Sequence, residues 1–202
     1  MDGVILDSEP VHFAAFQSTL KNYGYELSHA EYLAHFAGRT DREGFTSFFE
    51  SINESIDIQS IMSQKMETYL KLAKHQLVAY PGIVLLIKQL AATVPLALVT
   101  GSLRAEATVA LETLGISDCF QVMVCAEDVT NGKPDPEGYR KAQRLVGIPA
   151  DHCVVVEDSP SGVRAAKEAR IDCIAVTNTH GAEELQDATV ITNELAMQHF
   201  AS

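Results

Sequence analysis

The chain has 202 residues, enough for one large domain or for a core that carries a smaller insertion. Hydrophobic residues make up 47% and charged residues 21%, which is typical of a folded globular protein and argues against global disorder. The net charge of -12 argues against nucleic acid or an anionic membrane as the main partner, because both require clusters of Lys and Arg. An anionic small substrate remains compatible, since a local cation or a set of backbone N–H groups can hold a phosphate.

No apolar run approaches the roughly 20 residues of a membrane span, and no secretory signal precedes the fold. The four cysteines have no C-x-x-C spacing, and three of them lie in or beside apolar runs. We therefore expect free thiols in a cytoplasmic protein and no zinc site.

The first part of the chain, from about Pro10 to His75, carries helical signals only. Apolar residues recur at helical spacing, Ser28 is an N-cap candidate, and Gly24 and Gly38 are typical helix ends. The expected helices are 11–24, 28–38, 40–52 and 57–75. This pattern predicts a small bundle of four helices.

From Pro81 onward, helices alternate with short runs that are apolar throughout. The expected helices are 81–92, 103–115, 134–147 and 159–170, and the expected strands are 95–100, 121–128, 153–158, 173–177 and 188–192, with 194–200 completing the series. A further apolar run, GVIL, lies at 3–6. Such alternation predicts an α/β fold with a parallel sheet covered on both faces.

Ligands of such sheets bind at the carboxyl ends of the strands, so the polar residues after each apolar run are the candidates for function. These are Asp7-Ser8, with Asp2-Gly3 before GVIL, then Thr100-Gly101-Ser102, Gly132-Lys133-Pro134 and Glu157-Asp158-Ser159. Adjacent carboxylates at a strand end suit Mg²⁺. A hydroxyl and free N–H groups at a helix start suit a phosphate, and an aspartate in a turn suits proton transfer. The pattern contains no nucleophile beside them.

Four segments in this order resemble the haloacid dehalogenase-like hydrolase superfamily, in the branch related to β-phosphoglucomutase. They are DGVILDSEP at 2–10, VTGS at 99–102, GKPDPEGY at 132–139 and VVVEDSPSGVRAA at 154–166. The resemblance implies a Rossmann-like core at 1–9 and 78–202 and an inserted helical cap at 10–77. It also implies a Mg²⁺-dependent phosphatase of small phosphorylated metabolites, a sugar or polyol phosphate, acting as a monomer or weak homodimer.

The family's first motif, D-x-D-G, supplies a nucleophilic aspartate and then an acid/base aspartate. Asp2 matches the second, and Met1 falls on the intervening position. The resemblance thus implies a first strand and a nucleophile upstream of Met1, in the middle of the sheet. Either the natural chain starts further upstream, or this is a short chain that cannot form the phospho-aspartate.

Carried over to this chain, the resemblance gives each strand-end residue a role. Asp2 would exchange protons and offer its backbone carbonyl to Mg²⁺. Thr100 and the Gly101 N–H, with Ser102 beside them, would bind the phosphoryl group, and Lys133 would neutralise charge. Asp158 would ligate the metal, with Glu157 a ligand or held through water.

Four residues of the expected cap have two possible roles each. His12 is either an ordinary helix residue or points toward the substrate. Gly38, Arg39 and Thr40 are either a helix end followed by a helix start, or a specificity loop in which Arg39 reads a polar or anionic group.

Two other functions compete with the phosphatase. A phosphomutase of the β-phosphoglucomutase type is expected to carry cationic residues where this chain has Ala37 and Asp41. A catalytically inactive phosphate-ligand binder is the other alternative, supported by the missing nucleophile.

Overall fold

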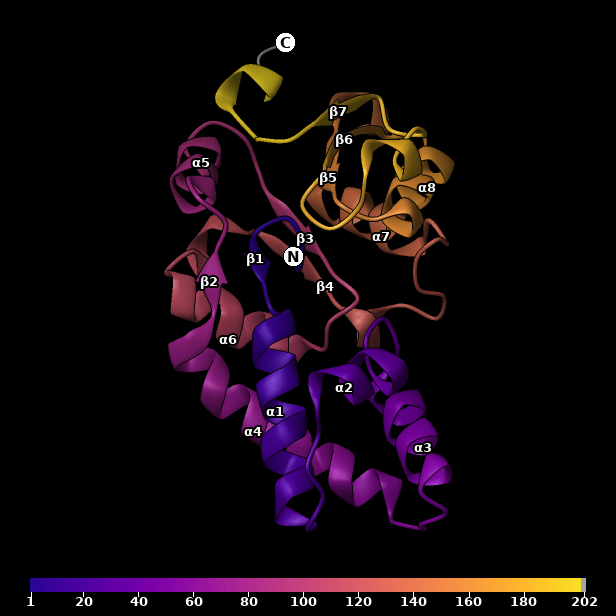
Figure 1. Cartoon of the computed structure of the whole chain (residues 1–202). Helices are drawn as coiled ribbons and strands as arrows, with labels where there is room; N and C mark the ends of the chain where they lie inside the picture. The colour runs from indigo at the N-terminus through magenta and orange to yellow at the C-terminus, as the bar shows by residue number, and fades with distance from the viewer. Residues whose placement is uncertain (201–202) are drawn as a thin grey trace. The chain divides into compact units, whose positions relative to one another are not determined.

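The computed structural model describes residues 1–200 of the chain, which divide into two compact units (Figure 1). The core unit comprises Met1–Asp7 and Val78–Ser202, and the helical unit comprises Ser8–Leu77. Each unit has its own cluster of buried hydrophobic side chains.

The helical unit consists of four helices, as the sequence predicts. They are α1 (Glu9–Asn22), α2 (His29–His35), α3 (Asp41–Ser51) and α4 (Ile58–Gln76). Ser28 and Thr40 begin α2 and α3 with reciprocal capping boxes, in which Glu31 and Glu43 complete the hydrogen bonds. The centre is aromatic; for example, the rings of Phe16, Tyr32, Phe36, Phe45 and Phe48 pack against one another. Tilted and edge-to-face aromatic pairs thus hold the helices together.

The core unit alternates strands and helices. Its strands are β1 (Leu6–Asp7), β2 (Val78–Ala79), β3 (Ala97–Val99), β4 (Val122–Val124), β5 (Val154–Glu157), β6 (Asp172–Val176) and β7 (Val190–Thr192). Its helices are α5 (Ile83–Ala91), α6 (Arg104–Leu114), α7 (Glu137–Val146) and α8 (Pro160–Ala169). Short 3₁₀ helices are η1 (Ser117–Cys119), η2 (Ala126–Asp128), η3 (Ala150–His152), η4 (Ala182–Glu184) and η5 (Met197–Phe200).

The strands of the core unit form three separate ladders. β3 pairs with β4, and β6 pairs with β5 and β7, all in parallel, whereas β1 and β2 form a short antiparallel pair. Within residues 1–200, β3 and β5 each have a strand partner on one edge only. The predicted parallel sheet is therefore present, but it is split between β3 and β5 (Figure 1).

The apolar run at 3–6 is not a strand over most of its length. Residues 3–5 form a turn, in which Gly3 has φ +70° and the Met1 carbonyl accepts hydrogen bonds from the Val4 and Ile5 N–H groups. Only Leu6 and Asp7 are extended, and they pair with β2 instead of joining the parallel sheet. An apolar run alone does not separate a buried turn from a buried strand.

The expected strand at 121–128 is shorter in the structure. The strand β4 ends at Val124, and η2 follows because the Asp128 carboxylate accepts the Cys125 N–H at 2.8 Å. The segment 194–200 contains the 3₁₀ helix η5.

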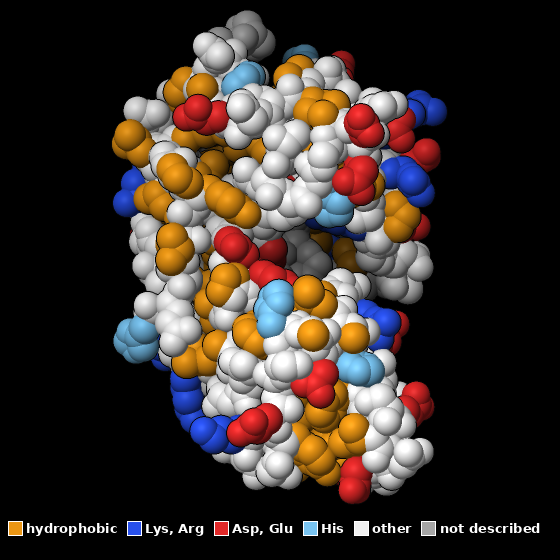
Figure 2. Space-filling view, viewed as in Figure 1, with side chains coloured by type: hydrophobic (Ala, Val, Ile, Leu, Met, Phe, Trp, Pro, Cys, Tyr) orange, Lys and Arg blue, Asp and Glu red, His pale blue; other side chains and the backbone are white. Residues whose placement is uncertain are grey.

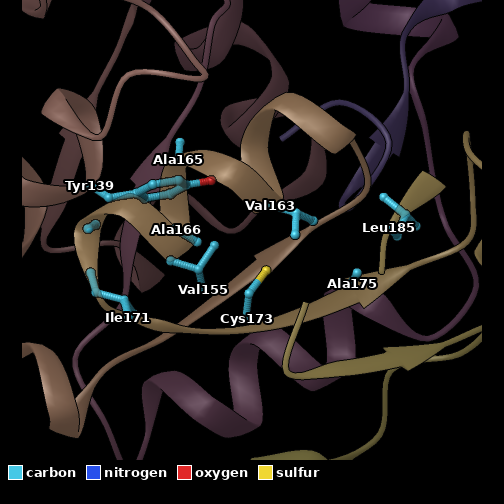
Figure 3. Close-up of a cluster of buried hydrophobic side chains, with 10 residues drawn as sticks. Tyr139, Val155, Val163, Ala165, Ala166, Ile171, Cys173, Ala175 and Leu185 are labelled. Carbon is cyan, nitrogen blue, oxygen red and sulfur yellow. The ribbon is translucent and has the colours of Figure 1, made fainter. Parts of the chain in front are cut away.

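Helices α7 and α8 cover the sheet where it is split. α7 packs against β3, β4 and α8, and α8 packs against β5 and β6. Val155 and Cys173 are aligned on neighbouring strands and point toward Val163 and Ala166 of α8, with the Tyr139 ring beside them (Figure 3). Val99 of β3 packs against the same cluster, so one hydrophobic core contacts both halves of the sheet.

The surface agrees with the acidic composition. On the face shown in Figure 2, Asp and Glu side chains are scattered, and Lys and Arg side chains lie at a few separate places. None of the described helices is long and apolar enough to cross a lipid bilayer. All four cysteines are free, and Cys125 and Cys173 are buried.

Candidate active site

Residues after β3 are linked by hydrogen bonds to the first residues of the chain. Thr100 is buried, and its hydroxyl donates to Ser102 Oγ at 3.1 Å while accepting the Ser102 N–H at 3.1 Å. Ser102 Oγ in turn donates to Asp2 Oδ2 at 2.7 Å. Three predicted site residues that are up to 100 positions apart therefore form one chain of hydrogen bonds at the end of β3.

Lys133 is held at the end of β5 by a buried carboxylate. Its ammonium group donates to Glu157 Oε1, and it lies 5.2 Å from the centre of the Tyr139 ring. The Tyr139 hydroxyl donates to the same oxygen at 2.6 Å. Glu157 is only 3% exposed, whereas the Lys133 side chain is 23% exposed, so a buried carboxylate anchors a lysine that stays accessible.

The second oxygen of Glu157 is also occupied. Glu157 Oε2 accepts the N–H groups of Asp158 and Ser159 and the Ser159 hydroxyl. Gly162 leaves the space for this carboxylate, since a Cβ there would lie 2.0 Å from Glu157 Cδ. Burial would raise the pKa of Glu157, but the charge of Lys133 and the hydrogen bonds from Lys133 and Tyr139 lower it to about 2.

One cavity brings the predicted phosphate-binding residues together. A space of about 250 Å³ is lined by Thr100, Gly101 and Lys133, with Cys125 and Asn131 also on its wall. The Gly101 N–H donates to no residue among 1–200, and a Cβ at Gly101 would meet nothing within 4 Å. Residues that carry a hydroxyl, an open backbone N–H and an ammonium group therefore line one cavity, and these are the kinds of donor that a phosphate needs.

Asp158 lies against the turn that contains Gly3. A Cβ at Gly3 would lie 1.9 Å from Asp158 Oδ2, so only glycine leaves room for this carboxylate. Burial, and the nearby negative charge of Glu157, raise the pKa of Asp158, although a hydrogen bond from Thr179 opposes this shift. Within the described residues, Asp158 has no ion pair with a Lys, Arg or His side chain.

The four candidates in the helical unit have local partners. Thr40 is the N-cap of α3, Gly38 has φ +71° after α2, and Arg39 Nη1 donates to Ser47 Oγ at 3.0 Å and to the His35 carbonyl at 3.3 Å. His12 stacks on Tyr69, with 4.3 Å between ring centres. Thr40 thus begins a helix as expected, whereas α2 ends at His35, three residues before Gly38. A substrate-binding role for these four residues stays a prediction.

Comparison with known proteins identifies the family of this chain. The model of the haloacid dehalogenase-like hydrolases matches residues 1–176. The chain belongs to the haloacid dehalogenase-like hydrolase family.

Several similar proteins are phosphatases by name. The chain is 33% identical to a validoxylamine A 7'-phosphate phosphatase of Streptomyces hygroscopicus subsp. limoneus, covering 96% of this chain and 91% of the relative. It is 31% identical to a phosphorylated carbohydrates phosphatase of Thermotoga maritima, covering 86% and 81%. Its structure matches that of a Thermotoga maritima protein provisionally named a β-phosphoglucomutase, with TM-score 0.83, 29% identity and coverage of 95% and 91%.

The residues present supply only part of the metal site that this family membership suggests. Among residues 1–200, no group of three His, Cys, Asp or Glu side chains could hold a metal ion, so the predicted trio of Asp2, Glu157 and Asp158 does not form a complete site. Both oxygens of Glu157 already accept hydrogen bonds. The Oδ1 atom of Asp158 accepts none from the described residues. The Asp158 carboxylate and the Asp2 backbone carbonyl are oxygen ligands of the kind that Mg²⁺ uses, since this ion commonly takes one or two protein carboxylates and retains several waters.

Several residues of this haloacid dehalogenase-like hydrolase were missed by the sequence analysis. Thr179 follows β6 and contacts Asp158, so the rule of searching after each apolar run would have found it. Lys65 is completely buried and pairs with Asp41 at 2.9 Å and with His12 Nδ1 at 3.0 Å. Its position on the buried face of α4, four residues from Tyr69, was the available signal, because a lysine at such a position requires a partner.

Proposed function

We propose that this protein is a Mg²⁺-dependent phosphatase that hydrolyses a small phosphate monoester, a sugar or polyol phosphate. The observation that carries the proposal is that Thr100, Gly101 and Lys133 line one cavity. These residues carry a hydroxyl, an open backbone N–H and an ammonium group. The names of the two relatives support the substrate class, since both act on phosphorylated carbohydrate-like molecules.

The proposed nucleophile is an aspartate upstream of Met1. The split between β3 and β5 supports this part of the proposal, because one parallel strand there would pair with both open edges. Residues 2 and 3 contact Ser102 after β3 and Asp158 after β5, so a strand leading into Met1 would end beside both. Its last residue would lie near Asp2, Thr100 and Lys133.

In the proposed reaction, the upstream carboxylate attacks phosphorus, and the bond to the leaving alcohol breaks. Asp2 gives its proton to the leaving oxygen, and later takes a proton from the water that hydrolyses the aspartyl-phosphate. Thr100, the Gly101 N–H and Lys133 bind the phosphoryl oxygens and stabilise their developing charge. Bound Mg²⁺ would supply Lewis-acid neutralisation of the phosphoryl charge, with Asp158 and Asp2 holding it.

The Ser102 hydroxyl keeps Asp2 in position for both proton transfers. Glu157 keeps Lys133 extended toward the cavity without taking part in the chemistry. The first interaction therefore serves proton transfer, and the second serves charge stabilisation.

The test compares two N-terminal extensions of the 202-residue chain. Each adds an apolar strand of about five residues, which ends directly before Met1 in Asp in one variant and in Asn in the other. We expect Mg²⁺-dependent phosphate release from a panel of sugar and polyol phosphates only with Asp. Release by neither variant, with both folded, would contradict the proposal and favour an inactive phosphate-ligand binder.

A phosphomutase is the second candidate, favoured by the structural match to the provisionally named β-phosphoglucomutase. The same assay separates the two functions. Conversion of a sugar 1-phosphate to the 6-phosphate in the presence of a bisphosphate would support the mutase, whereas inorganic phosphate as the sole product supports the phosphatase.

A further inference from the structure

Three polar residues after β6, Asn178, Thr179 and His180, bind residues from distant parts of the chain. Asn178 Nδ2 donates to the Gly3 carbonyl at 2.8 Å. Thr179 Oγ1 is hydrogen-bonded to Asp158 Oδ2 and lies 3.2 Å from the Asp158 carbonyl oxygen. We call these three residues the 178–180 segment. It joins the turn at Gly3 to the carboxylate after β5.

The protons in this group can be assigned from the acceptors. A carbonyl oxygen only accepts, so His180 Nδ1, at 3.0 Å from the Asp158 carbonyl, must carry a hydrogen. His180 Nδ1 is also 2.9 Å from Thr179 Oγ1, which can accept it. The single hydroxyl hydrogen of Thr179 is then directed to Asp158 Oδ2. The threonine is thus oriented by the histidine and donates to the carboxylate.

The two oxygens of Asp158 are therefore in different situations. Oδ2 accepts the Thr179 hydroxyl and lies against Gly3, whereas Oδ1 accepts no hydrogen bond from residues 1–200. A half-buried carboxylate with one oxygen restrained and the other open is suited to bind a cation through the open oxygen. Without the hydroxyl, the side chain could rotate and exchange its two oxygens.

We propose that Thr179 is a positioning residue for Asp158, which restrains Oδ2 so that Oδ1 is presented to a divalent cation. His180 orients the Thr179 hydroxyl, and Asn178 holds the Gly3 carbonyl so that the turn stays against Asp158. This inference extends the metal-binding part of the proposed function, but it is tested by metal binding and does not depend on phosphate turnover.

The test measures Mn²⁺ binding by the full 202-residue chain, using the loss of the free Mn²⁺ signal in electron paramagnetic resonance. Thr179→Val removes the hydroxyl at nearly constant volume, and we expect it to weaken Mn²⁺ binding about tenfold. Thr179→Ser keeps the hydroxyl and is expected to restore most of the affinity. The rise in melting temperature on adding Mn²⁺, which follows from binding to the folded state, gives a second readout.

Thr189→Val is the matched control. Thr189 Oγ1 accepts the Cys173 N–H at 3.0 Å and donates to Asp172 Oδ1 at 3.0 Å, so its loss removes comparable hydrogen bonds at the other end of β6. We expect a lower melting temperature without a change in Mn²⁺ affinity. The proposal is overturned if Thr179→Val binds Mn²⁺ as the unmodified chain does, if Thr189→Val weakens binding equally, or if the unmodified chain binds no Mn²⁺. Failure of the phosphatase assay with Mn²⁺ binding intact would affect only the proposed function.

Discussion

Replacing Glu157 by Gln tests the buried ion pair that fixes Lys133. The pKa of Glu157 falls from its ordinary value of 4.5 to about 2 in the folded protein. At about 1.4 kcal/mol per pH unit, this difference contributes about 3 kcal/mol to the free energy of unfolding at pH 7. Glutamine has no charge for Lys133 and presents an N–H₂ group to donors, so Glu157→Gln should lose about this amount.

The pH dependence makes the test specific. A group whose pKa is lowered by folding contributes stability above its unfolded pKa of 4.5, and this contribution disappears as the pH falls through the folded value of about 2. The difference between the unmodified chain and Glu157→Gln should therefore shrink from about 3 kcal/mol at pH 7 to about 1 kcal/mol at pH 3.

Urea denaturation followed by circular dichroism measures both values. At neutral pH the melting temperature should fall by about 6–12 °C for a chain of this size. Glu112→Gln, an exposed carboxylate on α6, is the control and should change stability by less than about 0.5 kcal/mol. The reasoning is refuted if Glu157→Gln costs less than about 1 kcal/mol at pH 7, or if its cost is the same at pH 3 as at pH 7.

Three further substitutions test other contacts. Lys65→Met should lower the free energy of unfolding by about 3 kcal/mol, because Asp41 loses its buried partner, and the double variant with Asp41→Asn should recover part of this loss in urea denaturation. An equal cost for both variants would contradict the pairing. Gly3→Ala should cost about 1–3 kcal/mol and weaken Mn²⁺ binding, because its Cβ would displace Asp158. Lys133→Met should lower the affinity for inorganic phosphate about tenfold in calorimetric titration, and unchanged affinity would exclude this lysine from the site.

Much of the fold could be predicted because its signals are local. Helical periodicity and the caps at Ser28 and Thr40 are contained in a few neighbouring residues, and so are the apolar runs of β5 and β6. The turn at 3–5 could not be predicted from the apolar run GVIL, because it depends on the positive φ of Gly3 and on space beside Asp158. That space is created by packing between distant segments, which composition does not encode.

The sequence predicted which residues belong to the candidate site, but not which residues pair with one another. The position of Thr100, Lys133 and Asp158 after apolar runs predicted one shared edge. Thr100 and Lys133 line the same cavity, and Asp158 is not among its lining residues. The partner of Lys133 is 24 residues away and that of Ser102 is 100 residues away. No periodic pattern spans such separations. The structure, and not the sequence, therefore shows that Glu157 is the partner of a lysine.

The adjacent carboxylates Glu157 and Asp158 acquire opposite properties from their surroundings. Burial disfavours the charge on both, but Glu157 faces Lys133 and several hydrogen-bond donors, and its pKa is lowered. Asp158 receives the Thr179 hydroxyl and the negative charge of Glu157, and its pKa is raised. Two carboxylates whose pKa values are driven apart in this way serve different purposes. Glu157 already has a cationic partner in Lys133, whereas Asp158 has none among the described residues. In the function that we propose, Asp158 would therefore hold the cation, and Glu157 would hold the lysine that contacts the phosphate.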